Sequence, residues 1–263
     1  MSEQEIVDAE IIEETPAAPQ GPIEIAVIGD DDNVLAQATY RAFDVPKGVN
    51  VNLYPFDQLD ACIESKPTIV FWCDEIGIKK NDVLDDGEFI ASVNRVIRAN
   101  GSGVCIRTPL NIETFERLIM SLGKQAFDNK IVYMPELSDS TDIETLINSD
   151  RQLVGGTPEA LNQHMGILRN MSWFGARTIN SGTIPEVIYV KLATSGLRLV
   201  QQTFFDQLHE AVLDMKNANP MTVNRLMESN LLPSNVSGRD VYDARIFAGA
   251  TDTLTLIDHC LEK

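Results

Sequence analysis

The chain has 263 residues, of which 44% are hydrophobic, and it carries a formal net charge of −18. This length suits one large domain or two ordinary domains with a substantial buried core. Because so negative a chain is repelled by phosphate backbones and anionic lipids, we expect no nucleic-acid partner and no membrane association. We also find no apolar run long enough to cross a bilayer, and the acidic N-terminus is unlike a signal peptide. A local basic pocket can still override the overall field for a nucleotide ligand.

The three histidines and four cysteines show no metal-binding or redox spacing. Cys73 and Cys105 lie in apolar runs, which is typical of reduced core cysteines in a cytoplasmic protein. We therefore expect a cytoplasmic location, no disulfide framework and no metal site.

Residues 1–22 are rich in Glu, Pro, Ala and Gln. A segment of this composition cannot bury enough apolar surface to fold, so we expect a disordered acidic tail. Its apolar pairs, Ile6–Val7 and Ile11–Ile12, leave open a short partner-binding segment.

From residue 23, short apolar segments alternate with helical patterns. Strands are expected at 23–30, 49–54, 67–74, 103–107, 130–135 and 151–156. Helices are expected at 33–43, 56–64, 87–99, 112–122 and 158–169, the first capped by Asp32 or Asn33. This alternation predicts an α/β fold: a doubly wound, Rossmann-like domain over 23–178, with a parallel sheet covered on both faces.

Residues 183–215 predict one long helix of roughly 40–45 Å. One of its faces is apolar, with side chains three or four residues apart: Val190, Ala193, Leu197, Val200, Phe204, Leu208, Ala211 and Met215. Its opposite edge is polar and reads either as a solvated face or as part of a site: Lys191, Ser195, Arg198, Gln202 and Asp206. A helix this long must join two domains or carry a subunit interface, so 179–263 reads as an all-helical, dimerisation-type domain.

Four landmarks follow one another in a familiar order. They are CIRTPL after a strand, then YMPELSDST, then DRQLVGG, then KLATSGLRLVQQTFFDQL on the long helix. Together they resemble the UDP-glucose/GDP-mannose dehydrogenase family. The resemblance implies an NAD-binding domain, a helical domain that forms a homodimer, and NAD-dependent oxidation of a nucleotide sugar. The family's C-terminal domain does not fit in the remaining length, so a truncated member is expected.

The cofactor parts of the family pattern are degenerate. Its Gly-x-Gly-x-x-Gly loop lets a pyrophosphate approach backbone amides at a helix start. Here the loop reads Gly29-Asp30-Asp31-Asp32-Asn33-Val34, which keeps only the first glycine. The aspartates read as an acidic capped turn or, alternatively, as ligands for a divalent cation. Asp57 lies a few residues past the place of the family's ribose-binding acid.

The resemblance assigns three catalytic positions. Thr108 matches a threonine that orders a water and is also expected to contribute to cofactor binding. Glu136 matches the glutamate of the family's Pro-Glu-Phe-Leu strand. Lys191 matches a lysine that stabilises oxyanion charge, although it also reads as an ordinary surface or salt-bridged lysine. Three other positions depart from the family, with Ser140, Ser195 and Asp206 in place of Glu, Asn and Asn.

The family's nucleophilic cysteine has no counterpart in the best matching loop, residues 245–254. Cys260 follows His259 on a later helix, where adjacent side chains point about 100° apart, so a core or incidental cysteine is the simpler reading. Three hypotheses stay open. The chain is an active, truncated dehydrogenase; or a pseudoenzyme that serves as a dimeric binding, regulatory or assembly subunit; or a protein with a different small-molecule activity.

Overall fold

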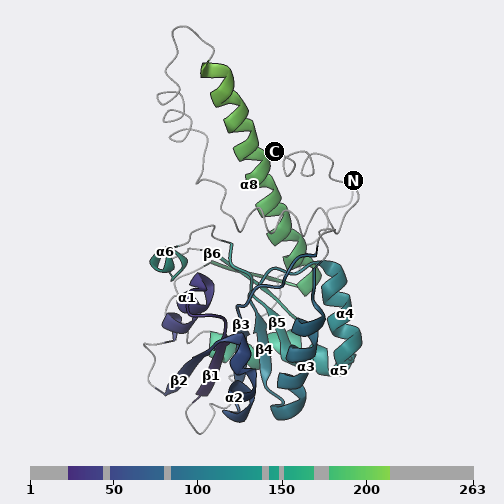
Figure 1. Ribbon diagram of the computed structural model, residues 1–263. Helices are drawn as coiled ribbons and strands as arrows, with labels where there is room; N and C mark the ends of the chain where they lie inside the picture. Colours follow the sequence, from purple (N-terminus) through teal and green to yellow (C-terminus); the bar gives the residue numbers. More distant parts are fainter. Residues whose placement is uncertain are drawn as a thin grey trace, which may run out of the picture.

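The computed structural model describes residues 23–43, 48–79, 84–137, 142–147, 151–168 and 178–213. Within them one seven-stranded sheet has the strand order β2-β1-β3-β4-β5-β6-β7 (Figure 1). The strands are β1 (Ile23–Ile28), β2 (Val49–Tyr54), β3 (Ile69–Trp72), β4 (Gly103–Ile106), β5 (Ile131–Tyr133), β6 (Arg151–Gly155) and β7 (Thr178–Gly182). The helices are α1 (Val34–Ala42), η1 (Phe56–Gln58), α2 (Leu59–Glu64), α3 (Gly87–Asn100), α4 (Ile112–Leu122), α5 (Lys124–Lys130), α6 (Ile143–Ile147), α7 (Pro158–Leu168) and α8 (Ile184–Leu213).

Strands β1 to β5 are all parallel, which confirms the predicted doubly wound, Rossmann-like architecture. After β2 the chain passes through α2 and enters β3 on the other side of β1, so the strand order reverses between β1 and β3. Ligands of open α/β sheets bind at such a reversal, outside the carboxyl ends of the strands. The dinucleotide-binding order 3-2-1-4-5-6 has one more strand outside β2. Within the described residues, β2 is itself the outer strand.

Strands β6 and β7 depart from the purely parallel sheet that we expected. β6 runs antiparallel to β5, and β7 pairs with β6 in parallel, residue for residue from Arg151–Thr178 to Gly155–Gly182. Parallel neighbours need a long crossover, usually a helix. In the described part of the connection before β6 the one helix is the short α6, and β6 runs antiparallel to β5. β7 was not predicted, and it carries the sheet past residue 178.

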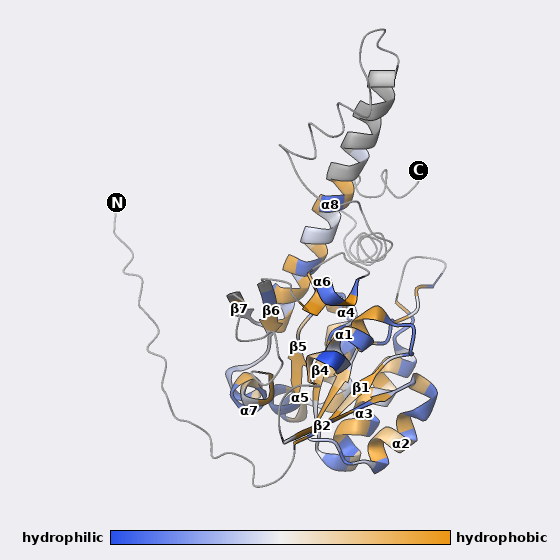
Figure 2. Ribbon diagram, turned by 90° about the vertical axis from the view of Figure 1, so that its left-hand side faces the viewer, coloured by the Kyte–Doolittle hydropathy of each residue, from blue (hydrophilic) through white to orange (hydrophobic). Residues whose placement is uncertain are grey.

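Two cores cover the two faces of the sheet. On one face α2, α3, α4, α5 and the first part of α8 pack against it, and on the other α1 and α7 do. Strands β3, β4 and β5 are buried at every residue, because a parallel sheet between two layers exposes neither face. Figure 2 shows the resulting apolar centre as orange strands inside helices that are blue on their outer sides.

The long helix α8 is continuous from Ile184 to Leu213 and projects away from the sheet (Figure 1). Its orientation reverses the simplest reading of its two faces. In the described part of the expected apolar stripe, Val190 is 47% and Leu197 is 59% exposed, whereas Lys191 and Ser195 of the polar edge are buried. A different set of α8 side chains packs into the core on the face of the sheet that α3 and α4 cover: Ile184, Val187, Ile188 and Leu192. Gly155 permits this contact, because a Cβ there would lie 2.9 Å from the Cα of Ile184.

Two cysteines lie where the sequence predicted. Cys73 and Cys105 are buried in the core, and Cys62, for which no prediction was made, is buried as well. Burial raises the pKa of Cys62 to about 12 and raises that of Cys105 strongly as well, so these two thiols stay protonated. Cys260 lies outside the described residues, as do the N-terminal tail and everything after residue 213. Within the described part of the chain, no helix is both long and apolar enough to cross a membrane.

Candidate functional site

The β1–α1 connection lies at the strand reversal, where a dinucleotide fold holds pyrophosphate. Gly29 follows β1 and touches α1 so closely that a Cβ would lie 2.7 Å from the Cβ of Ala36. Asn33, one of the two predicted caps, is the N-cap of α1. Its Oδ1 accepts from the backbone N–H of Ala36 at 3.0 Å, and its Nδ2 donates to the carbonyl of Cys73 at 3.0 Å. One amide of the helix start is therefore satisfied by the chain itself.

The same connection is strongly acidic. Asp30, Asp31 and Asp32 are exposed, and Asp74 is half-buried just beyond β3. Burial, followed by the charge of Asp30, raises the pKa of Asp74 to about 6. Burial disfavours the charged form of Asp74, and the neighbouring carboxylates disfavour it further. Additional negative charge at this position would therefore be unfavourable.

NAD does not fit this loop in the usual way. Asp31 and Val34 stand at the second and third glycine positions, where a side chain blocks close approach to the backbone. Each phosphate–carboxylate contact near 4 Å would cost roughly 1–4 kcal/mol, depending on exposure. The alternative of a cation site finds no geometric support either. Among the described residues, no three His, Cys, Asp or Glu side chains gather closely enough to hold a metal ion.

Asp57, a second candidate cofactor residue, lies in η1 just beyond the carboxyl end of β2 and is exposed. It follows Pro55 at the outer strand of the sheet. Gly29 and Asp57 therefore lie at the ends of the neighbouring strands β1 and β2, on one side of the strand reversal.

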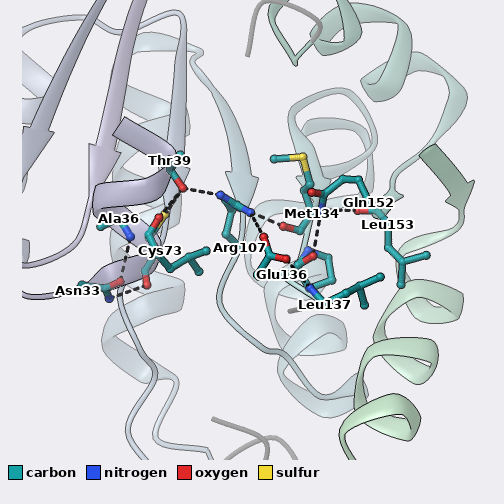
Figure 3. A network of polar contacts seen from close by, with 12 residues as sticks. Asn33, Ala36, Thr39, Cys73, Arg107, Met134, Glu136, Leu137, Gln152 and Leu153 are labelled. Carbon is teal, nitrogen blue, oxygen red and sulfur yellow. Dashed lines mark hydrogen bonds and ion pairs between the residues drawn. The ribbon is translucent and has the colours of Figure 1, made fainter. Parts of the chain in front are cut away.

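A buried network centred on Arg107 connects the two sides of this reversal (Figure 3). The guanidinium lies at the end of β4 and is 1% exposed. Its Nη1 donates to Thr39 Oγ1 on α1 at 2.5 Å, and its Nη2 contacts Glu136 Oε2 after β5 at 2.9 Å. Its Nε donates to the carbonyl of Met134 at 3.3 Å. Arg107 thus ties α1 to the β5 loop.

Glu136, a predicted catalytic residue, is held inside this network. It is 1% exposed, and its second oxygen, Oε1, accepts from the backbone N–H of Leu137 at 3.0 Å. Figure 3 shows the carboxylate facing Arg107. Both carboxylate oxygens therefore have protein partners, and the group is neutralised by a buried cation.

Thr108 and Lys191, the other two predicted catalytic residues, lie on the same side of the strand reversal as Glu136. Thr108 follows β4 and is fully buried, and its hydroxyl has no hydrogen-bond partner among the described residues. Lys191 is 1% exposed on α8, and its Nζ donates to Ser195 Oγ at 3.2 Å, one helical turn on. The reading of Lys191 as an ordinary surface lysine is wrong, because the side chain is buried.

Several expected site positions lie outside what the structure describes. These are Ser140, the side chain of Asp206, the loop 245–254 and Cys260. Conversely, the sequence reading did not single out Arg107. Its signal was an arginine directly after four apolar strand residues, since a buried guanidinium must find an acidic partner.

Comparisons with known proteins place the fold. No family model matches the sequence, and no curated protein does. Among solved structures, a UDP-D-ManNAc dehydrogenase from Pyrococcus horikoshii has a TM-score of 0.71 at 14% identity, covering 91% of this chain and 68% of that one. A UDP-glucose dehydrogenase from Pyrobaculum islandicum has a TM-score of 0.65 at 16% identity, covering 93% and 68%. A 3-hydroxyisobutyrate dehydrogenase from Mycobacterium tuberculosis has a TM-score of 0.62 at 12% identity, covering 91% of each chain. The chain therefore shares its fold with these dehydrogenases.

Proposed function

We propose that the chain is a relative of the nucleotide-sugar dehydrogenases whose ancestral reaction, NAD-dependent oxidation of a nucleotide sugar, has been lost. In this proposal it acts as a pseudoenzyme, a dimeric binding, regulatory or assembly subunit. The order of sequence landmarks and the fold likeness support the ancestry. The observation that carries the loss is the β1–α1 connection, where exposed aspartates and a self-capped helix occupy the place of a pyrophosphate.

The state of the remaining catalytic positions agrees with this proposal. Glu136 is paired with Arg107 inside the protein, so it is not available to bind substrate or to transfer a proton without first breaking a buried ion pair. The three described cysteines are buried in the core. A cysteine nucleophile needs a thiolate that can be reached, and thiols buried in the core do not provide one.

A homodimer is proposed through α8. The exposed side chains Val190, Ala193 and Leu197 follow one another in steps of three and four on the projecting helix. Exposed apolar side chains at this spacing are typical of helix–helix interfaces. Leu197→Glu should therefore lower the mass of the full chain measured by light scattering, whereas Thr194→Glu, on a neighbouring position, should change it less. Equal masses for the wild type and L197E would contradict the helix interface.

The decisive experiment on the cofactor is a titration with NAD and NADH. The substitution Trp173→Phe leaves Trp72, which is buried at the end of β3, as the single tryptophan and hence as the reporter. We expect no saturable change in its fluorescence up to millimolar dinucleotide. We also expect no reduction of NAD in the presence of UDP-glucose. Saturable binding at micromolar NAD would overturn the proposed loss.

A restored loop provides the positive control. The double substitution Asp31→Gly/Val34→Gly rebuilds the two missing glycines. Asp30→Asn removes the carboxylate whose charge raises the pKa of Asp74 most among its charged neighbours. If the loop is the obstacle, this triple variant should gain measurable NAD binding. Asp60→Asn removes an exposed carboxylate on α2, outside the loop, and should gain none.

A further inference from the structure

The outer edge of β2 is an interaction surface that the proposed function does not use. In the described residues no strand lies beyond β2, although the dinucleotide-binding strand order places one there. β2 pairs with β1 without a break over all six residues, from Ile23–Val49 to Ile28–Tyr54. Its other edge therefore presents a straight row of backbone donors and acceptors.

This edge lacks the usual protection against pairing. Natural edge strands carry charges, prolines or bulges that prevent another strand from adding to them. The sequence Val49-Asn50-Val51-Asn52-Leu53-Tyr54 contains no charged residue and no proline, and its register shows no bulge. In a chain with a net charge of −18, the strand itself is uncharged, which limits repulsion with a second negative chain. Glu24 on β1 borders it, and its Oε1 accepts a hydrogen bond from Nδ2 of Asn50 at 2.6 Å.

The backbone shows which residues point outward. The carbonyls of Gly48 and Tyr54 accept hydrogen bonds from β1, at 2.9 Å from the N–H of Ile23 and 3.0 Å from that of Gly29. Because backbone groups alternate in direction along a strand, the N–H and C=O groups of Val49, Val51 and Leu53 point away from β1.

The side chains follow the same alternation. Val49, Val51 and Leu53 are half-buried on the face covered by α1, and Asn50 and Asn52 are exposed on the opposite face. Beside the strand lies an open hollow of about 410 Å³. It is bordered by Tyr40 and Phe43 at the end of α1, by Val49 and Val51, and by the polar residues Glu24, Asn50 and Asn52. The apolar row is therefore incompletely covered at this edge.

We propose that β2 pairs antiparallel with β2 of a second copy of this chain, about a two-fold axis at Val51. In this register Val51 lies opposite Val51 of the second copy, Val49 opposite its Leu53, and Asn50 opposite its Asn52. Apolar side chains then meet on the α1 face and amides on the other face. The outward backbone groups of Val49, Val51 and Leu53 are the ones that antiparallel pairing about Val51 would use. No other centre within the strand satisfies both the backbone and the side chains so fully.

Disulfide cross-linking of the full chain tests the register. Val51→Cys places two thiols on directly opposed residues, whose Cα atoms are about 5.5 Å apart in a hydrogen-bonded antiparallel pair, within the range of roughly 4.4–6.8 Å that a disulfide spans. We expect V51C to form a covalent dimer under mild oxidation. Asn50→Cys, whose two copies would be displaced diagonally, and the unsubstituted chain should form little. Equal cross-linking of V51C and N50C, or none for V51C, would overturn the proposal.

Sedimentation of charge variants tests the contact without a new thiol. Asn50→Lys/Asn52→Lys places lysines opposite lysines in the paired register, and like charges directly opposite one another weaken strand pairing. The control Gln58→Lys/Ala61→Lys adds the same charge at exposed positions on η1 and α2. Both pairs are made in the wild type and in Leu197→Glu, which separates this contact from an α8 dimer. We expect N50K/N52K, and not the control pair, to lower the sedimenting mass in both backgrounds. An unchanged mass for N50K/N52K in both backgrounds would refute the pairing.

Removal of residues 1–22 distinguishes a second copy from the chain's own N-terminal segment as the occupant of this edge. If a second copy pairs with β2, V51C should cross-link equally with and without these residues. Cross-linking that appears only after the removal would show that this segment covers the edge, and would overturn the proposal. Because none of these measurements involves NAD, their outcome is independent of the proposed loss of oxidation.

Discussion

The β1–α1 connection and the β4–β5–α8 region lie along the same sheet, but the first exposes most of its charged side chains and the second buries them. The first leaves Asp30, Asp31 and Asp32 in solvent, with Asp74 half-buried behind them. The second buries Arg107 against Glu136 and Lys191 beside Ser195. A loop that holds only exposed charge can change its sequence without harm to the core. A buried charge cannot change alone, because its partner would be left unpaired.

Under the proposed ancestry, this contrast accounts for the larger departure of the first region from the dehydrogenase pattern. The β1–α1 connection has Asp31 and Val34 where that pattern has glycines, and its three aspartates are exposed. Thr108, Glu136 and Lys191 match the pattern as residue types, and all three are buried. A matching residue type therefore does not by itself indicate catalysis.

Arg107 gives the strongest test of the contrast. Arg107→Met should lower the free energy of unfolding by about 3–5 kcal/mol, because Glu136 would remain buried without its cation. Arg107→Met/Glu136→Gln should recover much of this loss, since neither charge of the pair is left. Urea denaturation of both variants and of Glu136→Gln alone completes the cycle. A double variant as unstable as R107M would mean that the ion pair is not what matters at this position.

A second test concerns His164 on α7, whose ring packs against the first residue of β4. Its ring packs so closely against Gly103 that a Cβ there would lie 2.1 Å from Cε1. Burial, then the charge of Lys130, lowers the pKa of His164 from 6.5 to about 4. The folded state therefore prefers the neutral ring. This contribution is fully present above pH 6.5 and is lost as the pH falls through about 4, by roughly 3 kcal/mol in total.

The measurement is the free energy of unfolding between pH 7 and pH 4 for the wild type and for His164→Gln. The carboxylates titrate in both proteins, so the difference between the two curves isolates the histidine. Parallel curves would show that the ring is not held neutral by the fold.

A third test compares two helix caps, one in each region. Asn33 caps α1 and also holds the carbonyl of Cys73, whereas the Oδ1 of Asn111 caps α4 by accepting from the N–H of Thr114 at 2.8 Å. Replacement of either by alanine should cost about 0.5–2 kcal/mol. We expect Asn33→Ala to cost more, because it also removes the bond to Cys73. If N111A is the more damaging variant in thermal and urea unfolding, the link between α1 and β3 contributes little.

The smallest expected effect concerns Asp74. Its pKa of about 6 arises from burial first and from Asp30 second. Asp30→Asn should therefore lower the pKa of Asp74 only in part, as followed by the carbon NMR shift of its carboxyl group. Glu64→Gln on α2 is the matched control and should leave it unchanged. An unaltered value in D30N would mean that the loop carboxylates are too well solvated to sense one another.

Much of this molecule follows from its sequence. Alternation of apolar runs with helical patterns predicted the doubly wound sheet, because strands buried on both faces must be apolar throughout. The pattern also predicted α4 and much of α8, whose apolar spacing is long and regular. The missed elements, α5, α6 and β7, are short, and short segments carry too little periodicity to be recognised. The degenerate glycine loop was equally visible, since its argument needs only residue types.

The tertiary structure decided what periodicity leaves open. A helix with several apolar stripes does not say which of them faces the body, and only packing against Gly155 turned Ile184 and Val187 inward and Leu197 outward. The same packing buried Lys191, which the sequence reads equally well as a surface residue. Nor could the sequence pair Arg107 with Glu136, which lie 29 residues apart. Such a pair depends on two parallel strands ending side by side, and that is fixed by the order of strands in the sheet rather than by either residue's neighbours in the chain.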